Sequence, residues 1–522
     1  MKGAFLTVYD GLDSIGGNKI LLESGEIRVF LDFGINFKKH SSLFAEFLKP
    51  RPARGVHDLL ELGLIPPLPI YREDLTPSDL DLPCDRPLDA VYLSHAHLDH
   101  WGCAGLLSLQ TTVCCSAMTA AILKGVQDVR RESPGEEVVY LSRREPDEDD
   151  SRVLNSPRNR NKPLEGRRVE VPELPPKLQE LWKQSPQTRP LNAELSKGSG
   201  PLPCKLWEVD HSIPGATAFA LETEAGWVVY TGDLRMHGTG GHLTEKFLEE
   251  AAGLEPRLLI IEGTRVGRKE ERRETEEEVY RNCLEICEGE RGLVVADFSP
   301  RNFERLETFR RIAEKTGREL AVLPEDAHQL RLIGCVEGRD TLSGLRVYRG
   351  LKGSKHAWEK NLLEELADRV LDPSEVSRRP SGYILCLSYW NLPNLLDIKP
   401  EGGTYLYSSS EAYSEEEVFD FQRLYSWLEH FHMRPVGFRF AGGGAGVRTW
   451  LPRLGPRPSR GAAPGHREDR AEGGPSGPHG AQGVVREGGE GGGGAPAQGG
   501  RAHPAYVSYP PLKGVGFPAR MC

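Results

Sequence analysis

The most informative residues of this chain are Ser94-His95-Ala96-His97-Leu98-Asp99-His100, which directly follow the apolar run Ala90-Val91-Tyr92-Leu93. Neutral imidazole is the commonest protein ligand for transition metals, and carboxylate suits the same ions. On an extended strand end, side chains two residues apart lie on one side, so His95 and His97 can chelate one ion. Asp99 and His100, beyond the turn, can reach a second ion. These residues predict a compact metal site, and the alternative is a structural histidine cluster that binds nothing.

Length, charge and cysteine usage bound the class of protein. The 522 residues have room for two or three domains, and the net charge of -10 gives no general reason to bind an anionic polymer. Nucleic-acid contacts would need a local basic groove or the metal ions themselves. We find no apolar run long enough to span a membrane and no signal-peptide features, so we expect no membrane association. The ten scattered cysteines form no CxxC pair, which favours a reducing, cytoplasmic setting.

Hydrophobic patterns divide the chain into segments. The first hundred residues and residues 207–261 read as short strands and tight turns, with a polar, Pro- and Arg-rich surface insertion at about 144–202. Residues 270–287 predict a helix with one charged face. From residue 293 strands and helices alternate, as in a parallel sheet, up to a helix at 414–431 headed by the capping box of Ser414 and Glu417. Residues 436–440 begin another strand, and the Gly- and Pro-rich residues beyond 441 predict a disordered tail.

The HxHxDH run, with partners downstream, resembles the metallo-β-lactamase superfamily. In chain order, the family's metal ligands match His95, His97, Asp99, His100, His211 and Asp233, while Asp32 matches a buried aspartate that supports the metal loop. The resemblance implies two divalent ions, zinc in the first place and manganese as the alternative. It places His95, His97 and His211 on the first ion, Asp99 and His100 on the second, and Asp233 between the two. Each motif also ends a strand-like segment.

Other readings of single residues stay open at this point. Taken alone, His211 and Asp233 are each more commonly polar residues that close a strand, and it is their order and local context that favour a metal-binding role. His40 and His237 have no matching role in the family, and we expect them on the surface or behind the ligands.

A second resemblance is to the β-CASP branch of that superfamily, whose members include ribonuclease J and mRNA 3′-end cleavage factors. In Ile261-Glu262-Gly263-Thr264, Glu262 matches the acidic residue that this branch places after the bridging aspartate, and it is a catalytic candidate together with Asp99. Ser299, Arg301 and Asn302 match a loop-to-helix start near substrate phosphates, where a helix N-terminus suits an anion. An ordinary helix start is the alternative for Arg301 and Asn302, and a plain strand-end charge for Glu262.

These resemblances imply an α/β fold: a metallo-β-lactamase αββα sandwich, an inserted β-CASP α/β cap and a low-complexity C-terminal tail. We expect the first domain at 1–270, the cap at 275–430, a return strand to the first domain at 431–440 and the tail at 441–522.

The chain departs from the family after residue 432. The family's His-x-Ser-Gly-His segment and its last metal histidine are missing, because no histidine lies between His432 and His466 and no later one has the right neighbours. Read one nucleotide later, the codons for residues 450–458 permit Gly-Phe/Tyr-His-Ala-Ser-Gly-His-Ala. In the same shifted frame, those for 478–481 permit His-Thr-Glu. The separation of the two, from Pro452 to Pro478, matches the family spacing. We therefore predict that the residues after about Gly444 are translated out of frame, with the slip in the glycine run at 442–444.

The expected function is metal-dependent hydrolysis of a phosphodiester, with single-stranded RNA as the substrate, by a metal-activated hydroxide. DNA stays an alternative substrate, because the 2′-OH contacts that identify RNA cannot be read from these residues. A small-molecule hydrolase of thioesters, lactones or lactams is a rival, as is a catalytically impaired product that lacks half of its metal site. A homodimer is left open.

Overall fold

The computed structural model describes residues 3–45, 47–83, 86–129, 133–157, 161–236, 238, 240–264, 266, 275–298, 302–408, 415–440, 447–449 and 520–521. Residues 1–453 and 517–522 belong to one compact unit, and the second unit, 454–516, lies outside the described residues.

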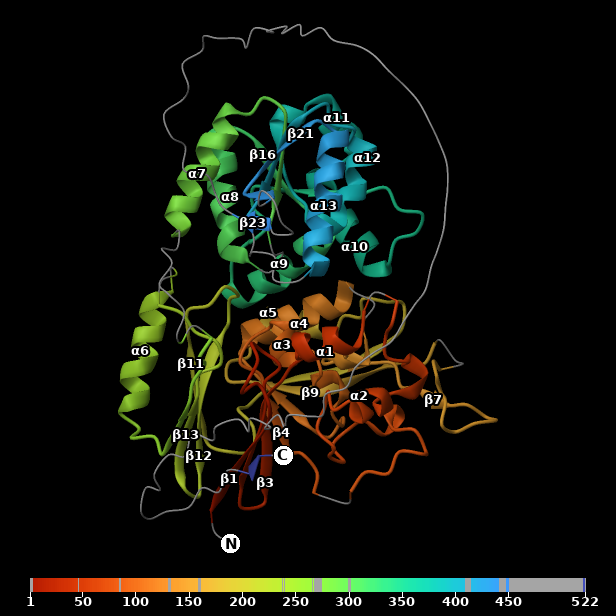
Figure 1. Ribbon diagram of the computed structural model, residues 1–522, viewed down its shortest axis with the longest axis vertical. Helices are drawn as coiled ribbons and strands as arrows, with labels where there is room; N and C mark the ends of the chain where they lie inside the picture. Colours follow the sequence, from red (N-terminus) through yellow and green to blue (C-terminus); the bar gives the residue numbers. More distant parts are fainter. Residues whose placement is uncertain are drawn as a thin grey trace, which may run out of the picture. The chain divides into compact units, whose positions relative to one another are not determined.

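Two sheets occupy the first part of the chain (Figure 1). The first sheet has the strand order β10 (Leu191–Lys197), β9 (Leu164–Val171), β5 (Thr112–Cys114), β4 (Ala90–Tyr92), β3 (Ile27–Phe33), β2 (Lys19–Ser24), β1 (Ala4–Asp10) and β24 (Arg520–Met521), with β6 (Tyr140–Leu141) also paired to β9. The second sheet has the order β11 (Cys204–Glu208), β12 (Thr217–Thr223), β13 (Gly226–Tyr230) and β14 (Leu258–Ile260).

The two sheets form a sandwich, because successive side chains along each strand point to opposite faces of its sheet. Val29 and Leu31 of β3 join the cluster that also contains Phe219 and Val228 of the second sheet, so the sheets pack face to face. Phe30 of β3 points to the opposite face and joins the core against the helices.

Helices cover both outer faces of the sandwich. The helices that pack on the first sheet are α2 (His57–Glu61), α3 (Leu98–Trp101), α4 (Ala117–Val129) and α5 (Pro176–Trp182). Helix α1 (Phe37–Leu43), which follows β3, has no buried residue. The outer face of the second sheet is covered by α6 (Gly241–Ala252), whose Phe247 and Ala251 are buried. The result is a four-layer αββα arrangement.

A third sheet follows, and all of its strands run parallel. Its order is β18 (Val370–Leu371), β17 (Leu345–Tyr348), β16 (Glu319–Val322), β19 (Tyr383–Cys386), β15 (Leu293–Asp297), β20 (Gly403–Tyr407) and β21 (Met433–Val436). Helices α7 (Glu276–Gly289), α8 (Phe303–Thr316), α9 (Pro324–Glu337) and α10 (Ala357–Glu365) pack on one face. Helices α11 (Pro373–Arg378), α12 (Leu395–Ile398) and α13 (Glu415–His430) pack on the other (Figure 1). Because both faces are covered, the strands read as continuous apolar runs.

The insertion at 144–202 differs from the expected surface segment. The strand pair β7 (Glu145–Pro146) and β8 (Leu154–Asn155) does lie in it, but β9 and β10 extend the first sheet and Trp182 of α5 is buried. In β10, buried Leu195 follows exposed Glu194, whereas β9 buries the polar Arg167 and Glu170 beside Val169 and Val171. The sequence of β9 reads as polar because charged side chains are buried in it.

The expected return strand at 431–440 is also placed differently. β21 pairs with β20 in the third sheet, where Met433 and Val436 are buried in its two cores. Gly437, at a φ of 97°, ends the strand, and β22 (Phe438–Phe440) pairs with β23 (Val447–Thr449). Burial of Met433 and Val436 in the cores of the third sheet therefore decides that residues 433–436 pair with β20.

Ser414 and residues 267–274 lie outside the described residues, and α7 instead begins at a capping box of Thr275 and Glu278.

Candidate metal centre

The ends of strands from both sheets of the sandwich position the histidines and carboxylates. His95 and His97 follow β4, and His97 is the N-cap of the short helix α3, which carries Asp99 and His100. His211 lies in the loop between β11 and β12, and Asp233 lies just after β13. Between β13 and Asp233, Gly232 has a φ of 56°, and a Cβ there would lie 2.6 Å from the Cβ of Ser94. A glycine is therefore needed where the two loops meet.

Three imidazole nitrogens converge at these strand ends. His95 Nε2 lies 3.0 Å from His97 Nδ1, which lies 3.2 Å from His211 Nε2. Burial lowers the pKa of His95 well below its usual value and that of His211 to about 4. The rings of His95 and His211 are therefore neutral at pH 7, which is the form that binds metal ions.

A second convergence joins His95, His100 and Asp233. His100 is completely buried, and among the described residues its Nε2 has no hydrogen-bond partner. That nitrogen lies 3.5 Å from Asp233 Oδ1 and 3.7 Å from Asp99 Oδ2. A buried nitrogen without a hydrogen bond, facing two carboxylates, fits a metal ion, because leaving such an atom unpaired is costly.

The charges of His100, Asp99 and Asp233 affect one another's pKa values. Burial raises the pKa of Asp99, and the nearby Asp233 carboxylate adds to the increase. Burial acts to lower the pKa of His100, but the Asp32 and Asp233 carboxylates outweigh it and raise that pKa well above its usual value. The pKa of Asp233 is lowered because its interactions with His100 outweigh the effect of burial. A cation at His100 Nε2, proton or metal, is what these carboxylates favour.

Asp32 is the centre of the hydrogen-bond network behind the cluster. It is completely buried, has a φ of 57°, and accepts hydrogen bonds from Ser94 N (2.7 Å), Ser94 Oγ (2.7 Å) and Tyr230 OH (2.6 Å). Its Oδ2 also lies 2.7 Å from His100 Nδ1. A carboxylate at Nδ1 fixes the proton there and aims Nε2 at the site. Asn18 Nδ2 in turn donates to Tyr230 OH (3.0 Å).

A chain of ion pairs, which the sequence reading missed, begins beside His211. Asp210 is buried and accepts hydrogen bonds from Arg235 Nε (3.0 Å) and Gly238 N (2.7 Å). Arg235 Nη2 donates to Glu304 Oε2 of α8 at 2.6 Å. The metal loops are thereby connected to the helix that follows β15. Only the Asp-His order at 210–211 hinted at this network.

The remaining candidates lie apart from the convergence. Glu262, at the end of β14, is half-buried and accepts a hydrogen bond from Thr264 N (2.9 Å). Asn302 is the N-cap of α8 and accepts from Arg305 N (3.0 Å), which is the arrangement of an ordinary helix start. Ser299, Arg301 and His237 lie outside the described residues. His40, on α1, packs its ring against Phe44.

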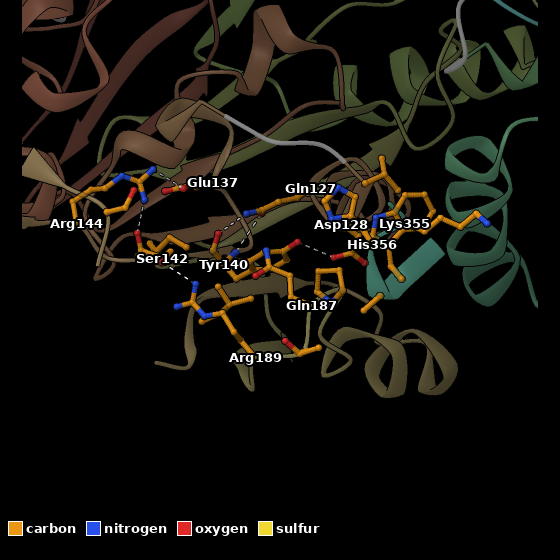
Figure 2. A pocket seen from close by; sticks show the side chains of 18 residues that line it. Gln127, Asp128, Glu137, Tyr140, Ser142, Arg144, Gln187, Arg189, Lys355 and His356 are labelled. Atoms are coloured by element: carbon orange, nitrogen blue, oxygen red, sulfur yellow. Dashed lines mark hydrogen bonds and ion pairs between the residues drawn. The ribbon is translucent and has the colours of Figure 1, made fainter. Parts of the chain in front are cut away.

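A cavity of about 750 Å³ lies between α4, the insertion and the start of α10 (Figure 2). Four of its charged side chains contact neighbours: Asp128 pairs with Lys124 (2.6 Å), Arg144 pairs with Glu137 (3.1 Å), and Arg189 Nη1 donates to Ser142 Oγ (3.0 Å). Lys355 also lines the cavity. None of the clustered histidines lines it.

Among the described residues, no helix is both long and apolar enough to cross a membrane.

Comparisons with known proteins give matches to solved structures and a short match in sequence. No known family profile matches the chain. Ribonuclease J of Corynebacterium glutamicum is 35% identical over 57 residues, which is 11% of this chain and 8% of that protein. A crystal structure of a protein of unknown function from Enterococcus faecalis V583 is 19% identical, covers 83% of this chain and 87% of its own, and has a TM-score of 0.55.

The metallo-β-lactamase MIM-2 matches 47% of this chain and 69% of its own at 14% identity, with a TM-score of 0.21. The chain spans less than a tenth of the length of the ribonuclease J that it matches. The αββα sandwich, with its histidine cluster at the strand ends, confirms the expected mixed α/β fold of the metallo-β-lactamase type.

Proposed function

We propose that this chain is a metal-dependent phosphodiester hydrolase that acts on single-stranded RNA and uses two divalent ions, zinc or alternatively manganese. The observation that carries the proposal is the buried Nε2 of His100, which has no hydrogen bond in the described residues and faces Asp99 and Asp233. Beside it, the nitrogens of His95, His97 and His211 converge. These two groups offer the nitrogen and oxygen donors that zinc and manganese bind.

In this proposal each side chain has a defined task. His95, His97 and His211 hold the first ion, Asp99 and His100 hold the second, and Asp233 lies between them. When bound, two such ions supply a hydroxide near neutral pH and neutralise developing charge on the phosphate. The Asp99 carboxylate, whose pKa is raised by burial, is suited to accept the proton of the attacking water. Asp32 orients His100, and Glu262 is a further catalytic candidate whose carboxylate shapes the turn after β14.

RNA is proposed as the substrate on two grounds. The short likeness to ribonuclease J is a likeness to an enzyme named for RNA. The ion pairs Asp210–Arg235–Glu304 also connect the metal loops to the additional parallel-sheet part of the chain, which provides a second wall for a polymer. Ser299, Arg301 and Asn302 remain proposed phosphate contacts at the start of α8.

The test is cleavage of an end-labelled single-stranded RNA, beside a DNA strand of the same sequence and a thioester, by the purified chain with its reading frame restored after about Gly444 and loaded with zinc or manganese. We expect RNA cleavage that His97→Ala or Asp233→Ala abolishes. His430→Ala is the matched control, because His430 is an exposed imidazole at the end of α13. Turnover of the thioester but not of RNA would overturn the substrate, and RNA cleavage by Asp233→Ala at the unaltered rate would overturn the site.

A further inference from the structure

A second cavity, of about 570 Å³, lies at the carboxyl ends of four neighbouring strands of the third sheet: β15, β16, β19 and β20. In open parallel sheets, ligands bind beyond the carboxyl ends of the strands, where the chain changes direction across the sheet. That condition is met here, because β15 is followed by β16 on one side of it and is flanked by β20 on the other. None of the clustered histidines lines this cavity, and it shares only Val129 with the cavity in Figure 2.

Its polar lining offers hydrogen-bond acceptors. Gln329 of α9 is only 6% exposed, and among the described residues its Oε1 has no hydrogen-bond partner. Asp326 lies three residues earlier on the same helix and lines the same cavity, so the two side chains share one helix face. Glu325 also lines the cavity but pairs with Lys352 at 3.1 Å. An unpaired buried carbonyl beside a carboxylate selects a ligand that carries N–H donors.

Its aromatic lining favours a planar ligand. Trp390, in the segment after β19, is 79% exposed, which is unusual for the largest apolar side chain, and its ring packs edge-on against Tyr389. Both residues line the cavity, together with Phe298 and Tyr407. No lysine or arginine is among the described residues that line it, so these residues favour a base over a phosphate.

We propose that this cavity binds a nucleobase of the RNA strand that has an exocyclic amino group, as adenine, cytosine and guanine do and uracil does not. Trp390 provides the stacking surface, and Asp326 and Gln329 accept the hydrogen bonds of the amino group. The proposal rests on the proposed function in taking RNA as the ligand. It adds a base preference, which hydrolysis at the metal centre does not require.

The position of the cavity agrees with such a role. Phe303 of α8 lines it, and the next residue, Glu304, pairs with Arg235, which pairs with Asp210 beside His211. The cavity is thus joined by these ion pairs to the loops of the metal centre, and in the proposal one base of a strand occupies the cavity while another of its phosphates lies at the metal centre.

The experiment measures binding of the zinc-loaded full chain to labelled oligoadenylate, oligocytidylate and oligouridylate by fluorescence anisotropy. Phosphorothioate linkages keep the strands intact. We expect tighter binding of adenine and cytosine strands than of uracil strands. Trp390→Ala should weaken binding of adenine and cytosine strands about tenfold, within the range known for loss of one stacked base, and Trp390→Phe should retain most of it. Leu396→Ala, which removes an exposed apolar side chain of α12, is the matched control and should change nothing.

Gln329→Leu tests the hydrogen bonds. It should bring the three strands to within about twofold of one another while leaving the melting temperature unchanged or higher, because it removes a buried acceptor without a partner. Equal binding of an abasic strand, an unchanged preference in Gln329→Leu, or no binding of any strand would overturn the proposal. The two proposals fail separately: base-selective binding without metal-dependent cleavage would overturn the hydrolase alone, and cleavage without base selectivity would overturn the base site alone.

Discussion

At the scale of single residues, Asp32 has the largest influence on the metal centre without being a ligand in our assignment. One buried carboxylate joins the backbone and hydroxyl of Ser94, the phenol of Tyr230 and the ring of His100. These partners come from the loop after β4, from strand β13 and from helix α3, so Asp32 fixes both the shape of the site and the direction of His100 Nε2. These four contacts also offset the energetic cost of the left-handed backbone conformation of Asp32.

We predict that Asp32→Asn lowers zinc affinity by about 10- to 100-fold, as loss of a carboxylate behind a histidine ligand typically does. The amide offers one acceptor oxygen in place of two, so His100 loses its fixed tautomer. The measurement is competition with a chelator of known affinity. Tyr230→Phe, which removes one hydrogen bond and no charge, is the control and should have a smaller effect. A zinc affinity within twofold of the unaltered chain would contradict the role given to Asp32.

Asp297, at the end of β15, yields a prediction on pH. Burial raises its pKa to about 7, although Tyr405 OH donates a hydrogen bond to it and the Tyr389 amide favours its charged form. The folded chain therefore keeps a proton on Asp297 between about pH 4 and 7, whereas the unfolded chain, with a pKa near 3.8, has released it. The stabilising effect of this proton is complete below pH 4 and is lost as pH rises to 7, by up to about 1.4 kcal/mol per pH unit.

The check is urea unfolding at pH 4 to 7 of the unaltered chain and of Asp297→Asn, which has no proton to release. We expect the free energy of unfolding of the unaltered chain to fall relative to that of the variant across this interval. Parallel pH profiles of the two proteins would show that Asp297 titrates normally.

At the scale of elements, the loop after β13 and the helix α8 are joined by Arg235. Its guanidinium pairs with the buried Asp210 on one side and with Glu304 on the other. The side chain of Arg235 is 19% exposed and that of Glu304 16% exposed, so water screens this pair less than a surface ion pair. The contact fixes how the segment after His211 meets the start of α8.

We predict a coupling free energy of about 1–3 kcal/mol between Arg235→Met and Glu304→Gln in a double-mutant cycle of urea unfolding. The matched control is the cycle of Arg311→Met and Glu277→Gln, whose side chains are 53% and 60% exposed. Exposed pairs of this kind contribute between 0 and about 1 kcal/mol. Equal coupling in the two cycles would contradict a special role for the Arg235 pair.

At the scale of the whole molecule, the open question is the second metal ion. The described residues provide His100, Asp99 and Asp233 for it, and the last histidine of the family pattern is missing from the chain. The out-of-frame hypothesis for the residues after about Gly444 remains a prediction, because residues 450–519 lie outside the described residues.

We predict that sequencing the gene across the codons for residues 442–447 reveals a missing or additional nucleotide. Restoring the frame should then raise the zinc bound per chain from one tightly held ion to two, measured by metal analysis after dialysis, because the restored histidine completes the second ligand set. An unbroken frame, or two tight ions already in the present chain, would contradict the hypothesis. The variant His97→Ala in the restored chain checks that the first site is counted correctly.

Much of the metal centre could be predicted from the amino-acid sequence. His95, His97, Asp99 and His100 lie within one turn of chain, so their local geometry alone brings them together, and the αββα fold followed from the resemblance that they carry. The periodicity of residues 293–323 likewise predicted strand, helix and strand, because a parallel sheet covered on both faces leaves unbroken apolar runs.

Contacts between residues that are far apart in the sequence could not be predicted and became known only from the tertiary structure. The Tyr230–Asp32 hydrogen bond joins residues 198 positions apart, and the Arg235–Glu304 pair joins residues 69 positions apart. No local pattern marks such partners, because each side chain is an ordinary polar residue until packing of sheets and helices places it beside the other. For the same reason the polar insertion was read as surface, although β9 and β10 extend the first sheet. The spacing of residues in the sequence determines which side chains lie on the same face of a strand or helix. Only the packing of segments that are distant in the sequence determines whether that face contacts solvent, the core or a functional partner.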